Sequence, residues 1–139
     1  MIRFGFTAVV AMMLAGTAQA ATLTPAEIVA RHNAAVAGSN VEAMLADYAD
    51  DAVVLQDGKA LQGKPAIRAL FTRMFPKPAP GAAPSGAAAM TVTRKWAEGD
   101  VGFYSWQMGA VSGTDEFLVR NGKIKVQTVF IKSAPPPAQ

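Results

Sequence analysis

The sequence contains no cysteine and a single histidine, and it has no stripe of basic residues. Without cysteine the chain can form no disulfide bond and carry no lipid on an N-terminal cysteine, so its stability must come from packing. One histidine and no carboxylate cluster at ligand spacing argue against a metal site. A glycine-rich nucleotide loop is also missing. We therefore expect no metal, no cofactor and no nucleic-acid partner.

The first 20 residues have the pattern of a secretory signal peptide. Arg3 precedes an apolar run, and Ala18 and Ala20 form the Ala-x-Ala pattern that signal peptidase recognises. The run is shorter than the roughly 18 to 20 residues that span a bilayer, which argues against a membrane anchor. We expect cleavage before Ala21, a periplasmic or secreted protein, and no membrane attachment after cleavage.

The rest of the chain has the length of one domain, over residues 21–132, followed by a Pro-rich tail at 133–139 that we expect to be disordered. Thr24 and Glu27 form a capping box that, with Pro25, predicts a helix over residues 25–37.

A second helix is predicted from the cap at Asn40 to Asp50 and Asp51, with Tyr48 on its apolar face. Asp57 and Gly58 then separate two short β segments, which predicts a hairpin.

A third helix is predicted from about Pro65 to the break at Pro76. Residues 76–89 are rich in Pro, Ala, Gly and Ser, so we expect a mobile loop, either a lid or a tolerated insertion. Alternating residues separated by turn signals then predict four strands, at 90–96, 101–108, 115–120 and 123–132. The order α-α-β-β-α-β-β-β-β favours an α+β fold with three helices on one face of a curved, mostly antiparallel sheet.

This order of elements resembles the nuclear transport factor 2-like superfamily, and specifically its SnoaL-like and ketosteroid isomerase-like branch. The matching strings lie at 46–54, 63–67, 115–117 and 121–124. The resemblance implies a cone-shaped domain with an apolar pocket between the helices and the concave sheet. Such folds host isomerases, cyclases, dehydratases and epoxide hydrolases, and also members that only bind or assemble.

Asp115 is the most informative candidate. Strand alternation places it on the same face as Phe117 and Val119, where a carboxyl group is costly unless it is protonated, paired or functional. The resemblance implies a carboxylic acid at this position that donates a hydrogen bond to a substrate oxyanion. Such an acid stays protonated because its apolar site raises its pKa, and ketosteroid isomerase is the known example. The alternative is an aspartate that caps the turn at residues 112–114.

His32 lies one helical turn from Ile28 and Val36, so we expect its ring to face the interior. The resemblance places a hydroxyl-bearing aromatic residue at this position, which a histidine could replace as donor, acid or base. The alternative is a core histidine satisfied by one backbone carbonyl.

Gln56 stands where the resemblance implies the proton-shuttling aspartate of the isomerases, which argues against steroid isomerase activity. Asp57 alternates to the other face and is predicted to form the turn. We expect Gln56, Tyr48 and Trp106 to line the pocket, although the aromatic pair could equally fill the core.

Three functions follow from these residues. One is an enzyme with cofactor-free acid/base chemistry, an isomerase, cyclase or dehydratase in which Asp115 and His32 act as acid or base. The second is a module that only binds a small apolar molecule. The third is a homodimeric assembly domain, in which an open sheet face is buried against a second copy.

Overall fold

The structure is a computed structural model, and it describes residues 22–76 and 90–133. These residues form three helices and six strands: α1 Pro25–Ala37, α2 Val41–Ala46, β1 Tyr48–Gln56, β2 Lys59–Gln62, α3 Gly63–Met74, β3 Thr91–Glu98, β4 Val101–Met108, β5 Val111–Arg120 and β6 Lys123–Ser133. The expected order of elements is confirmed. The predicted signal peptide, nearly all of the predicted loop and residues 134–139 of the predicted tail lie outside the described residues.

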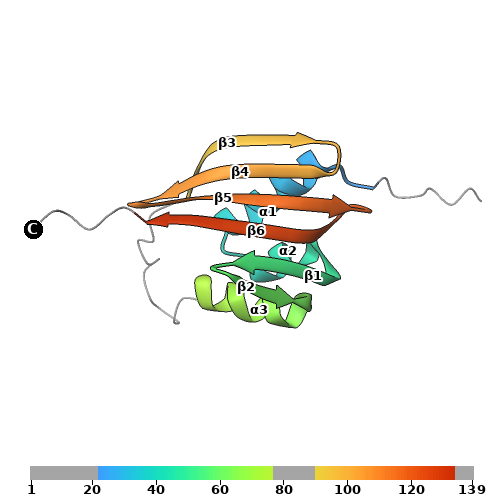
Figure 1. Ribbon diagram of the computed structural model, residues 1–139, viewed down its shortest axis with the longest axis horizontal. Helices are drawn as coiled ribbons and strands as arrows, with labels where there is room; N and C mark the ends of the chain where they lie inside the picture. The colour runs from blue at the N-terminus through green and yellow to red at the C-terminus, as the bar shows by residue number, and fades with distance from the viewer. Residues whose placement is uncertain (1–21, 77–89, 134–139) are drawn as a thin grey trace, which may run out of the picture.

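The six strands form one sheet in the order β2-β1-β6-β5-β4-β3. Figure 1 shows this order from bottom to top, with β3 uppermost. Neighbouring strands are antiparallel except for β1 and β6, which are parallel. The sheet is therefore mixed but mostly antiparallel, as expected. Strands β5 and β6 occupy its centre, and the side chains on their inner face are the ones that reach the middle of the domain.

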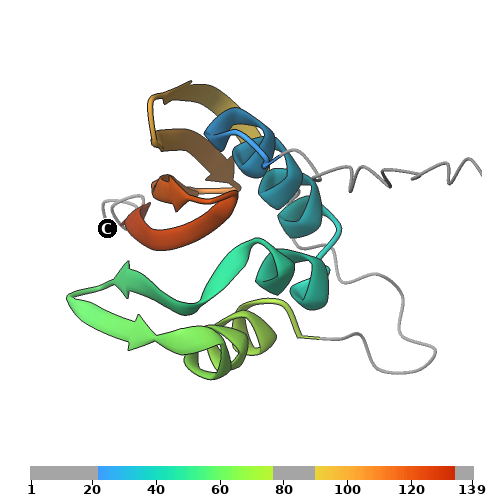
Figure 2. The same cartoon turned by 90° about the vertical axis from the view of Figure 1, so that its right-hand side faces the viewer.

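The helices cover one face of the curved sheet (Figure 2). Helix α1 packs against β3, β4 and β5, α3 packs against β1 and β2, and α2 contacts both other helices. The apolar core lies between the two layers and includes Ile28, Met44, Ile67, Phe117 and Ile124. This arrangement confirms the α+β cone that the sequence predicted. Within the described residues, no helix has both the length and the apolar character to cross a membrane.

Local sequence signals account for the element ends that were predicted well. The Thr24 hydroxyl accepts from the backbone N–H of Glu27, whose carboxylate accepts in turn from the backbone N–H of Thr24. Asp57 and Gly58 both adopt positive φ, at 51° and 70°, as a tight type I′ hairpin turn requires. Asp57 is therefore a turn former, as predicted.

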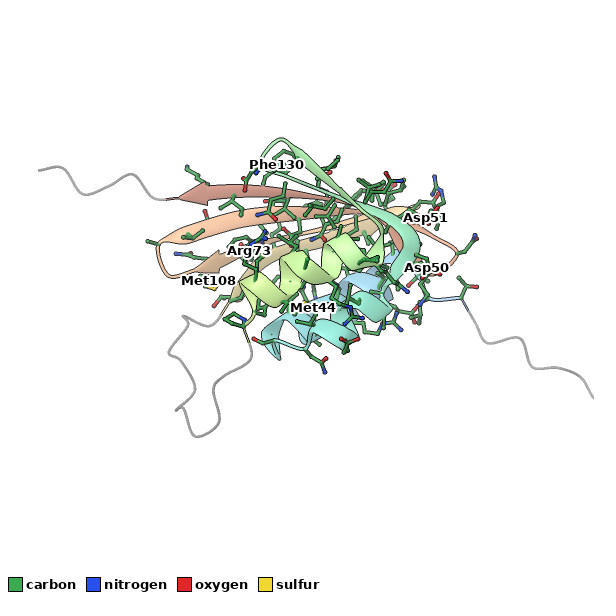
Figure 3. All side chains as sticks on the ribbon, turned by 90° about the horizontal axis from the view of Figure 1, so that it is seen from below. Met44, Asp50, Asp51, Arg73, Met108 and Phe130 are labelled. Atoms are coloured by element: carbon green, nitrogen blue, oxygen red, sulfur yellow. The ribbon has the colours of Figure 1, made fainter. Side chains whose placement is uncertain are left out.

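The predicted end of the second helix is wrong. Helix α2 stops at Ala46, and Tyr48 already belongs to β1, where it pairs with Ile124 of β6. The backbone N–H of Ile124 donates to the Asp47 carbonyl at 2.8 Å, so a strand distant in sequence captures this segment. Asp50 and Asp51 consequently lie in a strand rather than at a helix end, and both remain exposed (Figure 3).

Several other boundaries also differ, among them β3, which runs from Thr91 to Glu98 instead of over 90–96. Helix α3 begins at Gly63 rather than Pro65, and β5 begins at Val111 rather than Asp115. Ser133, which was assigned to the tail, is the last residue of β6. In β5 the extra residues pair with both neighbouring strands, which sequence alternation alone could not indicate.

Candidate functional site

A pocket of about 200 Å³ lies between the helices and the inner face of the sheet. Its inner wall combines polar and aromatic side chains from four elements, namely His32, Tyr104, Trp106, Asp115 and Gln127. These five side chains are all buried.

The open end of the pocket is formed by Met74, Phe75, Met90 and Met108, which are partly or fully exposed. Met108 and Arg73 lie toward the same end of the molecule, and Asp50 and Asp51 lie at the opposite end (Figure 3). Flexible thioether side chains at such an opening can adapt to ligands of different shapes.

Asp115 lies on the inner face of the central strand β5, as strand alternation predicted. It is 7% exposed, and Phe117 and Val119 are buried on the same face. Tyr104 is its direct cross-strand neighbour on β4. The carboxyl group therefore lines the pocket rather than capping a turn.

Two side chains on the neighbouring strands donate to the Asp115 carboxylate. Trp106 Nε1 lies 3.2 Å from Oδ1, and Gln127 Nε2 lies 3.3 Å from Oδ2. Tyr104, the cross-strand neighbour of Asp115 on β4, also lowers the pKa of this carboxyl group. Because the donors come from both sides of β5, they fix the position of both carboxylate oxygens.

Burial raises the pKa of Asp115 above its ordinary value, and this effect prevails over the hydrogen bonds and the charge of His32, which lower the pKa. The expected direction of the shift is confirmed. A carboxyl group with a raised pKa exchanges protons closer to neutral pH, which general acid/base catalysis needs.

Gly113 makes room for this arrangement. It is the cross-strand partner of Trp106, and a Cβ atom at position 113 would lie 2.4 Å from the Cζ2 atom of the indole. Only a glycine leaves room for the ring beside β5, where its Nε1 reaches Asp115. The sequence placed Gly113 in a turn at residues 112–114, whereas it lies inside β5, where a glycine is a known sign of close approach.

Tyr48 is fully buried, but it does not line the pocket. Its hydroxyl donates to Oε1 of Gln127, and this leaves the Nε2 of Gln127 directed to Asp115. Burial, followed by the charges of Asp115 and Asp47, raises the pKa of Tyr48 well above its ordinary value. The hydroxyl thus stays protonated and orients the Gln127 amide. Gln127 itself was missed by the sequence analysis.

His32 faces the interior as predicted and borders the pocket. Its ring lies against those of Tyr48 and Phe117, with centroids 5.5 and 5.4 Å away. Its Nδ1 atom is 3.4 Å from Oδ2 of Asp47, an ion-pair distance without hydrogen-bond alignment.

Asp47 is a second residue that sequence reasoning missed. Its side chain is 0% exposed, and its Oδ1 atom lies 2.5 Å from Nε of Arg31, which is about half exposed. The carboxylate therefore joins a surface guanidinium to the buried imidazole of His32. No periodic signal marks Asp47, because the residue follows directly after a helix and was counted as part of it.

Gln56 borders the pocket from the end of β1, as expected. Its Nε2 atom lies 3.4 Å from Oδ2 of Asp57, whereas Oε1 is buried without a hydrogen-bond partner among the described residues. An amide cannot shuttle protons, so Gln56 offers a ligand polar contact only.

In the described part of the chain, no group of three or more His, Asp, Glu or Cys side chains could hold a metal ion. The catalytic roles of Asp115 and His32 and the binding roles of Gln56 and Trp106 stay predictions, whereas Tyr48 lies behind the pocket wall and contacts Gln127.

The sequence profile of the SnoaL-like domain family matches residues 29–127. No curated protein is significantly similar to the chain in sequence.

Solved structures share the fold at low sequence identity. An NTF-2 like protein of unknown function from Burkholderia xenovorans LB400 is 23% identical, with a TM-score of 0.63, and the match covers 82% of this chain and 86% of the other. The epoxide hydrolase/cyclase-like enzyme SalBIII, of pyran ring formation in the polyether salinomycin, is 20% identical with a TM-score of 0.62 over 78% and 90% of the two chains.

A protein with a ketosteroid isomerase-like fold from Catenulispora acidiphila DSM 44928, in complex with trimethylamine, is also 20% identical. Its TM-score is 0.58, and the match covers 78% of this chain and 86% of the other.

Proposed function

The chain belongs to the SnoaL-like domain family, and on that premise we propose that its pocket binds a small, largely apolar molecule and performs cofactor-free acid/base chemistry on it. Asp115 and His32 are the two groups that would transfer protons. The family resemblance suggests the reaction class of an isomerase, cyclase or dehydratase, and the neighbour SalBIII is an epoxide hydrolase/cyclase-like enzyme.

The observation that carries this proposal is the burial of Asp115 in a pocket whose other walls are mainly apolar. A buried carboxyl group destabilises a fold unless its environment compensates, and the side chains of Trp106 and Gln127 do so from two neighbouring strands. A buried carboxyl group with a shifted pKa and several dedicated partners is typical of functional sites.

Binding can be tested with N-phenyl-1-naphthylamine, which fluoresces strongly in apolar surroundings. We expect the protein to enhance its fluorescence, Leu70→Trp to abolish the effect by filling the pocket, and the matched control Leu55→Trp to retain it. Leu70 borders the pocket and is buried, whereas Leu55 lies on β1 outside it and is 38% exposed. Absence of enhancement by the wild type would overturn the proposal.

The chemistry can be tested through proton exchange at carbon, a step that isomerisation and elimination share. We expect the protein to accelerate deuterium uptake from D₂O into 2-tetralone, measured by ¹H NMR, and both Asp115→Asn and His32→Gln to slow it. A wild-type rate equal to that of buffer would contradict the catalytic half of the proposal and favour a module that only binds.

As a second candidate we propose a homodimeric assembly domain, because large apolar side chains are exposed along the end of β6. Phe130 is 56% exposed and Ile131 is 39% exposed, and both border a shallow groove beside Leu55. A second copy is the partner that would cover them.

We also propose that the protein is exported to the periplasm or secreted, on the strength of the Ala18-Gln19-Ala20 pattern after the apolar run. The intact mass of the exported protein should correspond to a chain that begins at Ala21. A soluble exported form that retains residues 1–20 would contradict this.

A further inference from the structure

Asp47 lies behind the pocket rather than in its wall. It follows helix α2 and does not border the pocket, whereas His32 does. Its backbone is fixed on both sides, because its N–H donates to the Met44 carbonyl at 3.1 Å and its carbonyl accepts from the N–H of Ile124 at 2.8 Å. The side chain of Asp47 therefore starts from a fixed point between α2 and β1.

The two oxygens of this carboxylate face different partners. Oδ1 lies 2.5 Å from Nε of Arg31, and Oδ2 lies 3.4 Å from Nδ1 of His32. Oδ2 and Nδ1 are both buried, and neither has a hydrogen-bond partner among the described residues. Hydrogen bonds between catalytic groups often become short and aligned only when the substrate binds. Each of these two atoms is thus the partner that the other lacks.

Three aromatic rings restrict the rotation of the His32 ring. It lies edge-on to Tyr48 and Phe117, with centroids 5.5 and 5.4 Å away, and its centroid is 6.1 Å from that of Phe71. A carboxylate only accepts, so the proton of the neutral ring belongs on Nδ1 and the lone pair on Nε2. Because the ring borders the pocket and Nδ1 faces Asp47, Nε2 is the nitrogen that a ligand can reach.

We propose that Asp47 is a positioning residue, which holds His32 with Nδ1–H toward the protein and Nε2 toward the ligand. The inference rests on the proposed function, in which His32 transfers protons. When Nε2 takes a proton from the carbon next to a carbonyl group, the C–H bond breaks, its electron pair stays on the resulting enolate, and an N–H bond forms. The imidazolium keeps Nδ1–H against the Asp47 carboxylate, which stabilises its charge, so the ring can return a proton from Nε2 without turning.

The tautomer can be observed directly, because His32 is the only histidine of the chain. Two-bond ¹H–¹⁵N correlation spectra of the labelled protein, recorded at a pH where the ring signals have become those of the neutral form, show which nitrogen carries the proton. We expect Nδ1 in the wild type. In Asp47→Asn the amide oxygen should accept from Arg31, which directs the amide N–H to Nδ1 of His32. Nδ1 must then accept, and the proton should move to Nε2.

The same variant should lose activity and retain binding. A neutral ring whose Nε2 already carries the proton cannot take another one there, so deuterium uptake into 2-tetralone should fall at least about tenfold in Asp47→Asn. Enhancement of N-phenyl-1-naphthylamine fluorescence should remain as in the wild type, which shows that the pocket is intact. The matched control Asp51→Asn, at an exposed carboxylate paired with Lys125, should leave the tautomer, the uptake and the fluorescence unchanged.

The outcomes separate this inference from the proposed function. A proton on Nε2 in the wild type would overturn the inference without any variant, and so would an unchanged tautomer in Asp47→Asn. Full deuterium uptake in Asp47→Asn would also overturn it, because the activity would then not depend on how the ring is held. Wild-type uptake equal to that of buffer, with both tautomers as expected, would overturn the proposed chemistry while confirming that Asp47 orients His32.

Discussion

Gly113 and Trp106 face each other across β5 and β4, and the indole ring occupies the space that a side chain at position 113 would fill. The missing side chain at position 113 of β5 thus determines where the indole nitrogen of Trp106 on β4 lies. Nε1 of Trp106 reaches Asp115 because nothing projects from Gly113.

Gly113→Ala should destabilise the protein by about 1 to 3 kcal/mol, because the new methyl group would clash with both the indole and the carbonyl oxygen of Phe130. Urea unfolding measures the loss, and the indole N–H resonance of Trp106 should shift as its bond to Asp115 is disturbed.

Gly38→Ala is the control for this change. Gly38 has a φ of −83°, and the nearest atom to an added Cβ is 3.4 Å away. A stability loss in Gly113→Ala no greater than in this control would contradict the close packing of the ring.

Arg31→Met should destabilise the protein by about 2 to 3 kcal/mol, because it leaves the Asp47 carboxylate buried without its cation. The loss is smaller than for a fully buried pair because Arg31 is about half exposed. Chemical unfolding at neutral pH provides the measurement.

Arg68→Met makes the same substitution in an ion pair with Glu42 whose partners are both exposed, so it should change stability little. Equal losses of stability in the two variants would mean that the buried Asp47 carboxylate does not need the charge of Arg31.

Phe130→Ser should shift the protein from dimer to monomer in sedimentation velocity, if the exposed end of β6 is the interface of the second candidate function. Val101→Ser is the control, since Val101 is also exposed, at 42%, but lies at the start of β4. A wild type that stays monomeric at high concentration would rule out this assembly.

The parts of the fold that the sequence predicted depend on contacts between residues close in the chain. The capping box at Thr24, the turn at Asp57 and Gly58 and the alternation around Asp115 are all of this kind. Each can be read from a few neighbouring residues, because the backbone geometry fixes what those residues must do.

The parts that could not be predicted depend on contacts across the chain. Tyr48 belongs to a strand because β6, more than 70 residues later, pairs with it. Asp47 is a partner of His32, and Gln127 a partner of Asp115, only because the sheet and α1 bring them together. A strand register can place such residues, whereas a local pattern cannot.

The central claim, a buried Asp115 with a raised pKa, is tested most directly by the stability of the wild type relative to Asp115→Asn at two pH values. The unfolded chain loses the Asp115 proton first, near pH 4, while the folded protein retains it until its higher pKa is reached. In this window the wild type loses stability as pH rises, by at most about 1.4 kcal/mol per pH unit. The asparagine variant does not lose stability in this way.

Urea unfolding of both proteins at pH 4 and pH 8 gives their free energies of unfolding. Subtracting the two values at each pH removes the contribution of the other carboxyl groups, which both proteins share. We expect the free energy of unfolding of the wild type, relative to Asp115→Asn, to be lower at pH 8 than at pH 4. A wild type that instead gains stability over the variant as pH rises would mean that the fold stabilises Asp115 as an anion, and would contradict the account.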